Sequence, residues 1–223
     1  MVDGKNQPPV NPVVLKYENK DEYKLIDTLV DWSEEYGGLD SFTRVQWCVE
    51  SYKDVKYRRT ILWLDDCFAE VVRVGNPHKR NVNYCLHTLG SIENEGEKIS
   101  GDYREEGPLR YIKSVEELPA GEEIKIGSEK NLISMHHFSE DSRIYKGKGP
   151  GNPSVSDIDY LFIESSEQEI YYINIFDYSS EKKRKNVSLT KNGSTIHIEI
   201  GDKEHKSYYT LDMKSSGAEV AVK

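Results

Sequence analysis

The last third of the chain constrains the fold most, because residues 157–213 form five short runs that read as β-strands. Strict alternation of apolar and polar side chains is typical of a strand that buries one face. The dipeptide Asn192-Gly193 tolerates the positive φ angles of a type I′ hairpin turn. Counting outward from this turn places Leu189 opposite Ile196, so apolar residues meet each other. The pattern predicts a five-strand antiparallel meander.

The same register test extends to the next strand of this meander. A loop at residues 202–205 places Ile198 opposite Tyr209 and Ile196 opposite Leu211. The polar residues between them fall on the other face. This part of the sheet is therefore expected to have one buried face and one solvated face, as antiparallel sheets commonly do.

Two runs upstream have a different pattern, because they are apolar on both faces. These runs are residues 158–163 and 170–176, and a hairpin between them would place Ile163 opposite Ile170. Strands without a polar face are typical of positions covered on both sides. We expect other parts of the chain to supply this cover.

Near the amino terminus, residues 19–36 carry the features of an amphipathic helix. Asn19 stands at a capping position, Glu22 completes a capping-box spacing, and Gly37-Gly38 provides a stop. The apolar stripe would consist of Leu25, Ile26, Leu29 and Val30. A second, shorter capping-box spacing predicts a helix at residues 114–118.

Alternating segments elsewhere predict further strands. They are residues 43–49, 60–64, 67–74, 82–89, 123–126 and 131–138. The sequence thus predicts an α+β fold, predominantly antiparallel β-sheet, with a C-terminal five-strand meander and one N-terminal amphipathic helix. The expected organisation is a flexible N-terminus (1–14), an N-terminal α+β half (15–107) and a C-terminal β-meander half (108–223), possibly within one continuous domain.

Composition limits the class of protein. The chain has 223 residues, of which 36% are hydrophobic and 31% charged, and 15 tyrosines argue against disorder. No apolar run is long enough to cross a membrane, and the first fourteen residues are polar and proline-rich, so neither a membrane span nor an export leader is expected. Three well-separated cysteines fit a reducing cytosol.

The charge is acidic and unevenly distributed. The formal net charge is −9, and acidic residues concentrate in residues 18–40 and 93–123. Such a field repels nucleic-acid phosphates and favours a basic partner protein, although an acidic balance is also an ordinary route to solubility. The basic run at residues 182–185 has no interleaved aromatic residues, so it is weak evidence for nucleic-acid binding.

One candidate for metal chemistry is the pair His136-His137 with the acids that follow it. Adjacent residues on a strand point to opposite faces, so only one of the two histidines could join a given metal site. His137 is the residue that we consider, and a packed or surface histidine is the simpler interpretation. We expect no metal or other cofactor.

A second candidate is the pair Asp157 and Asp159, which would share one strand face. The expected hairpin would put Asn174 across from Asp159. Two carboxylates and an amide can hold Mg²⁺ or position a water molecule. The alternative is that these polar groups mark the place where an apolar sheet opens to solvent.

The third candidate is the glycine-rich segment at residues 146–153, which reads as a loop. Glycine-rich backbone with lysines can cradle phosphate, but the segment lacks the Gly-Lys-Ser/Thr ending of a P-loop. A flexible connection is the simpler interpretation. Because loops on rigid sheets often carry binding residues, Lys146, Lys148 and Asn152 are the leading interaction residues.

These observations lead to one functional hypothesis and two alternatives. The absence of a coherent catalytic constellation and the acidic, tyrosine-rich surface indicate a non-enzymatic, cytoplasmic protein-binding module. Immunity proteins, antitoxins and anti-defence inhibitors present such surfaces to basic partners. The alternatives are a metal-dependent hydrolase or nuclease using Asp157 and Asp159, and a nucleotide or phosphate sensor using residues 146–153.

Overall fold

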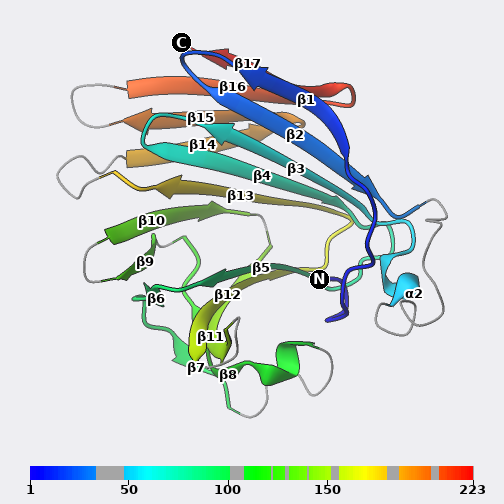
Figure 1. Cartoon of the computed structure of the whole chain (residues 1–223), viewed down its shortest axis with the longest axis vertical. Helices are drawn as coiled ribbons and strands as arrows, with labels where there is room; N and C mark the ends of the chain where they lie inside the picture. The colour runs from blue at the N-terminus through cyan, green and yellow to red at the C-terminus, as the bar shows by residue number, and fades with distance from the viewer. Residues whose placement is uncertain are drawn as a thin grey trace.

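A computed structural model describes residues 1–33, 48–100, 108–121, 123–128, 131–139, 141–151, 156–179, 186–201 and 206–222. Almost all regular structure in these ranges is antiparallel β-sheet, as predicted (Figure 1). The described helices are short: α2 is Val49–Tyr52 and the 3₁₀ helix η1 is Pro108–Tyr111. None of the described helices is long and apolar enough to cross a membrane.

The largest sheet has eight strands and occupies the middle of the molecule. Its order is β1 (Val13–Asn19), β2 (Lys24–Asp31), β3 (Lys56–Trp63), β4 (Cys67–Gly75), β13 (Glu169–Asp177), β10 (Asn131–Phe138), β9 (Ile124–Ser128) and β6 (Ser91–Ile92). Strands from the first and last parts of the chain are therefore direct neighbours in this sheet.

Two smaller sheets accompany it. The five-stranded sheet has the order β5 (Val82–Thr88), β12 (Asp157–Ser165), β11 (Arg143–Pro150), β8 (Lys113–Leu118) and β7 (Glu97–Lys98). The four-stranded sheet has the order β14 (Asn186–Asn192), β15 (Thr195–Gly201), β16 (Lys206–Lys214) and β17 (Gly217–Val222). In Figure 1 the four-stranded sheet lies toward the top and the five-stranded sheet toward the bottom.

The middle of the eight-stranded sheet is buried on both faces, and the side chains of β4 show how. Ala69 and Val71 belong to a core shared with β15, β16 and β17 of the four-stranded sheet. Val72 and Val74 belong to a second core shared with β12 and β11 of the five-stranded sheet. Since successive residues point to opposite faces, one apolar strand supplies both cores. The same arrangement explains why residues 170–176 of β13 have no polar face. Residues 158–163 of β12 also contribute to two cores, with Leu161 and Ile163 in one and Phe162 in the other.

The predicted helix at residues 19–36 is wrong in the part that the structure describes, because strands β1 and β2 occupy residues 13–31. Asp27 concealed the strand pattern: its side chain is fully buried, on the same face as Leu25. A carboxylate at a core position interrupts the apolar alternation, so the remaining apolar residues imitate a helical stripe. Residues 34–36 lie outside the described ranges.

The other local predictions had mixed outcomes. The strands predicted at residues 60–64, 67–74, 82–89, 123–126 and 131–138 are confirmed as β3, β4, β5, β9 and β10. The short helix predicted at residues 114–118 is wrong, because this segment is strand β8, paired with β11. The predicted strand at residues 43–49 lies mostly outside the described ranges.

The predicted five-strand meander is correct only in its last part. Strands β12 and β13 do not pair with each other: β12 lies between β5 and β11, whereas β13 lies between β4 and β10. The expected hairpin with Ile163 opposite Ile170 is therefore wrong. The actual meander contains the four strands β14 to β17, including Gly217–Val222, which lies beyond the predicted strands at residues 157–213.

Register within the meander was predicted correctly for one strand pair and shifted for another. Between β15 and β16, Ile198 lies opposite Tyr209 and Ile196 opposite Leu211, as predicted. Between β14 and β15 the pairing is two residues away from the prediction, with Leu189 opposite Ile198. Gly193 has a φ of 59°, and it is the first of two turn residues rather than the second. A two-residue shift leaves every side chain on its predicted face.

The division of the chain into residues 1–14, 15–107 and 108–223 stays a prediction. Both larger sheets combine strands from before and after residue 107. Val2, within the first fourteen residues, is buried and bridges to Val82.

A buried ion pair joins the eight-stranded and four-stranded sheets. The Arg58 guanidinium donates hydrogen bonds to both carboxylate oxygens of Asp27, at 3.0 and 2.6 Å. Asp27 also accepts from the hydroxyl of Thr60 at 2.8 Å and from the backbone N–H of Ala218 at 2.8 Å. Arg58 donates further to the carbonyl of Met213 at 3.2 Å. The last two bonds tie strands of different sheets together.

We predict that Asp27→Ala lowers the free energy of unfolding by about 3 to 5 kcal/mol, because the buried Arg58 would lose its counter-charge. The matched control is Asp31→Ala on the same strand, since Asp31 pairs with Lys56 at the surface and should contribute less than about 1 kcal/mol. Urea unfolding measures both. The double variant Asp27→Leu with Arg58→Met should lose less free energy of unfolding than Asp27→Ala alone. A larger loss in the double variant would contradict this explanation.

Candidate functional site

The segment with Lys146 and Lys148 is a strand rather than the predicted loop, since residues 146–150 belong to β11. Lys146 pairs with Glu116 at 3.0 Å and also donates to the carbonyl of Asn94. Lys148 pairs with Asp159 of the neighbouring strand β12. Both lysines therefore already have anionic partners.

The glycines of β11 have a packing role. A Cβ atom on Gly147 would lie 2.5 Å from Cγ2 of Ile112, and one on Gly149 would also collide with Ile112. Ile112 is buried in a small, separate hydrophobic core that also contains Val115, Tyr145 and Phe162. Glycine is needed here because the backbone of β11 lies directly against this side chain.

Asp157 and Asp159 do not form the predicted site with Asn174. Asp159 pairs with Lys148, and its second oxygen accepts a hydrogen bond from the N–H of Ile92 at 2.8 Å. Asp157 is exposed at the start of β12, opposite Pro150. Asn174 belongs to another sheet, and Asn152 lies outside the described residues. In the described ranges, no group of three or more His, Cys, Asp or Glu residues is placed to hold a metal ion.

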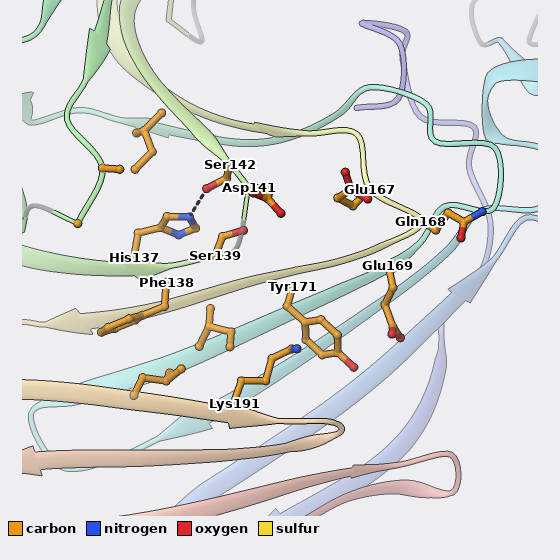
Figure 2. A pocket seen from close by; sticks show the side chains of 15 residues that line it. His137, Phe138, Ser139, Asp141, Ser142, Glu167, Gln168, Glu169, Tyr171 and Lys191 are labelled. Atoms are coloured by element: carbon orange, nitrogen blue, oxygen red, sulfur yellow. Dashed lines mark hydrogen bonds between the residues drawn. The ribbon is translucent and has the colours of Figure 1, made fainter.

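His137 is the one predicted site residue that lines a cleft, and this cleft has a volume of about 720 Å³ (Figure 2). The cleft lies beside the end of β10, where the chain turns toward β11. Its polar lining consists of His137, Ser139, Asp141, Ser142, Glu167, Gln168, Glu169, Tyr171 and Lys191. Its apolar lining consists mainly of Phe138, Ile144, Ile173 and Leu189. All three sheets therefore contribute to it.

His137 is the end of a polar row that crosses three neighbouring strands. His137 on β10 lies directly opposite Asn174 on β13, and Asn174 lies directly opposite Glu70 on β4. The Nδ1 of His137 is 2.7 Å from Oδ1 of Asn174, whose Nδ2 donates to Glu70 at 3.2 Å. Glu70 also accepts from Arg59 and from the hydroxyl of Tyr84, each at 2.6 Å. The interior end of the row is thus fully hydrogen-bonded.

This row determines the tautomer of His137. The Glu70 carboxylate only accepts hydrogen bonds, so the amide nitrogen of Asn174 faces it and the amide oxygen faces His137. The proton of the imidazole must then be on Nδ1, which donates to that oxygen. Nε2 is left as an acceptor toward the cleft, and the hydroxyl of Ser142 donates to it at 3.4 Å (Figure 2).

The three residues Ser142, His137 and Asn174 have the order of a nucleophile, a base and an orienting group. However, burial lowers the pKa of His137 to about 4, against the weaker opposing effect of the Asn174 hydrogen bond. A general base works best when its pKa is near the operating pH. His137 is therefore a weak base, and its arrangement suits a neutral hydrogen-bonding role at the wall of the cleft.

The rim of the cleft is acidic. Glu167 pairs with Lys79 at 3.1 Å and Glu169 with Arg73, and neither basic partner lines the cleft. Asp141 is exposed and has a φ of 52°, an uncommon conformation for a residue other than glycine. Among the described lining residues, Lys191 is the one lysine or arginine, and its ammonium lies over the ring of Tyr171 at 4.7 Å.

Most residues of the cleft were missed by sequence reasoning. Ser142 lies just before β11, whereas Asn174 is on β13 and Glu70 on β4, and no spacing motif connects the three residues. One signal was available: Asn174 stands alone among the apolar residues 170–176, and a lone polar residue in a buried strand needs a partner. The partner could not be identified without the strand order.

No family model matches this chain, and no curated protein matches it either. Among solved structures, the chain is similar to the crystal structure of heparan sulfate lyase HepC from Pedobacter heparinus, with a TM-score of 0.55 and 7% sequence identity. The match covers 95% of this chain and 28% of that chain. At this identity the likeness shows the fold alone.

We predict that Gly147→Ala lowers the free energy of unfolding by about 1 to 3 kcal/mol, because the added methyl group collides with Ile112. Gly75→Ala is the matched control in another strand, where the nearest atom would be 3.7 Å away. Denaturant unfolding of both variants provides the test. Equal stability of the two variants would contradict the packing role.

The buried His137 predicts a pH dependence of stability. Its pKa is about 4 in the folded protein and about 6.5 when unfolded, so the unfolded state takes up a proton first as the pH falls. Stability should decline from pH 7 to pH 4, with a contribution from this residue of roughly 3 kcal/mol. Urea unfolding across this range should show a shallower dependence for His137→Gln. Ser142→Ala, which leaves His137 buried, should keep the wild-type dependence.

Proposed function

We propose that this protein is a non-enzymatic binding module that holds a basic segment of another protein in the cleft beside His137. The observation that carries the proposal is the composition of the cleft lining. In the part of the lining that the structure describes, the acidic residues Asp141, Glu167 and Glu169 accompany one lysine, Lys191. A volume of about 720 Å³ lies within the usual range of ligand pockets.

The acidic rim is available to a partner. The side chains of Glu167 and Glu169 are about half exposed. Their ion-pair partners Lys79 and Arg73 are exposed as well. Exposed ion pairs of this kind contribute about 0 to 1 kcal/mol. An incoming lysine or arginine can therefore replace the present partner at little cost, which supports electrostatic recognition of a basic segment.

The aromatic and apolar part of the lining supports the same proposal. Tyr171 already holds a lysine against its ring, and Arg73 lies at 5.7 Å from the same ring. Aromatic residues are favoured in protein interfaces because they combine an apolar face with affinity for cations. If the partner is a basic effector protein, the binding module would act as an immunity protein, an antitoxin or an inhibitor.

The alternatives have less support from the arrangement of the residues. Asp159, Lys146 and Lys148 take part in ion pairs within the five-stranded sheet. His137 belongs to a different sheet from Asp157 and Asp159. A divalent metal that raises the melting temperature of the wild type, but not that of Asp159→Ala, would favour the metal-dependent hydrolase over the binding module.

We predict that Glu167→Lys weakens partner binding roughly tenfold at low salt, because an attraction becomes a repulsion worth about 1 to 2 kcal/mol. Glu219→Lys is the matched control: Glu219 is similarly exposed and also pairs with a lysine, but it lies on β17 outside the cleft. Capture from a lysate of the native host, followed by mass spectrometry at low and high salt, identifies the partner. Binding measurements on the two variants then test the site.

Salt provides the second criterion. Electrostatic association weakens as ionic strength rises. If no protein is captured at either salt concentration, or if both charge reversals have the same effect, the proposed function is wrong.

A further inference from the structure

One edge of β13 is only half covered by its neighbour. Strand β4 pairs with β13 along its whole length, from Glu169 to Asp177. On the other side, β10 pairs only from Ile173 to Asp177, because β10 ends at Phe138. The half from Glu169 to Tyr172 has no strand partner on that side within the described parts of the chain.

The backbone groups on this free half point toward the missing neighbour. On the β4 side, the N–H of Asn76 donates to the carbonyl of Gln168 at 2.7 Å, and the N–H of Tyr178 donates to Asp66 at 3.1 Å. Successive residues of a strand direct their backbone groups to alternate sides. The backbone N–H and C=O groups of the even-numbered residues of β13 therefore point toward β4. The N–H and C=O groups of Glu169 and Tyr171 face the opposite side.

The free half of β13 coincides with the cleft. Glu169 and Tyr171 line it, and Phe138 at the end of β10 closes it in the direction of the strand (Figure 2). Ile144 of the five-stranded sheet and Leu189 of the four-stranded sheet lie on either side. The cleft thus lies in line with β10. The five-stranded and four-stranded sheets form its two walls, and the unpaired edge of β13 forms its floor.

We propose that an extended, lysine- or arginine-containing segment of the partner protein adds to this edge as a strand, continuing β10 antiparallel to β13. This inference rests on the proposed function and specifies its binding mode. Backbone groups at an open sheet edge pair readily with an added strand, and side-chain pockets then give specificity. Alternate side chains of the segment would face the Ile144 wall and the Leu189 wall. The acidic rim explains why the segment is basic.

The test uses a displayed library of random twelve-residue peptides selected on the full chain. We expect enriched peptides to be basic and to bind with alternate backbone amides engaged. A scan of single N-methylated versions of the best peptide should lose at least tenfold in affinity at every second position, and much less between. This period-two response needs no variant of the protein. Failure to enrich any peptide, or a scan without period two, would overturn the inference.

A pair of variants tests the edge directly. Glu169 is the first residue of β13, where proline is tolerated, and its N–H faces the cleft. Glu169→Gln keeps this N–H and removes the charge, whereas Glu169→Pro removes both. We expect the proline variant to bind the selected peptide about tenfold more weakly than the glutamine variant. Equal affinities would contradict strand addition, and equal melting temperatures would show that both variants are folded.

The outcomes separate this inference from the proposed function. If the captured partner binds in a salt-dependent manner but is insensitive to Glu169→Pro, the binding function stands and strand addition is wrong. If sedimentation shows a dimer that Glu169→Pro dissociates, a second copy of the chain occupies the edge, and the inference of a partner segment is wrong.

Discussion

The ion pair between Asp27 and Arg58 is the interaction on which the rest of the structure depends. Both side chains are almost fully buried, at 0% and 6% exposure, so each needs the other to remain charged in the interior. Through Ala218 and Met213 the pair also reaches the last strands of the chain. It thereby fixes the four-stranded sheet, which supplies Leu189 and Lys191 to the cleft, against the eight-stranded sheet.

The opposite face of the eight-stranded sheet carries a second polar row, from His137 through Asn174 to Glu70. Both networks consist of residues that face each other across neighbouring strands and satisfy one another. Buried polar groups of this kind specify one register, because a shifted strand would leave them unpaired. The second row ends at the cleft, so the same hydrogen bonds that define the sheet also orient His137 at the wall of the cleft.

Part of this architecture was predictable. The strands β3, β4, β5, β9 and β10 follow from the local pattern of apolar residues. The pairing of β15 with β16 follows from alternation, because a one-residue shift would move the apolar side chains to the solvated face. The candidate site was predicted poorly. His137 is a packed histidine, the simpler of its two interpretations, while Lys146 and Lys148 lie in a strand whose glycines pack against Ile112. The sequence does not show whether a glycine is needed because the backbone turns there or because another side chain packs closely against the backbone.

The sequence by itself determined the secondary-structure type over most of the chain and the side of each strand that is buried. It could not determine sheet order, because strands with two apolar faces, such as β12 and β13, accept partners from anywhere in the chain. Tertiary structure decided that Asp27 is a core residue, that Asn174 meets His137, and that β10 ends before β13 does. The open half of β13 exists only because β10 is offset along it and pairs only from Ile173 to Asp177. The offset between two neighbouring strands is not a property of local sequence.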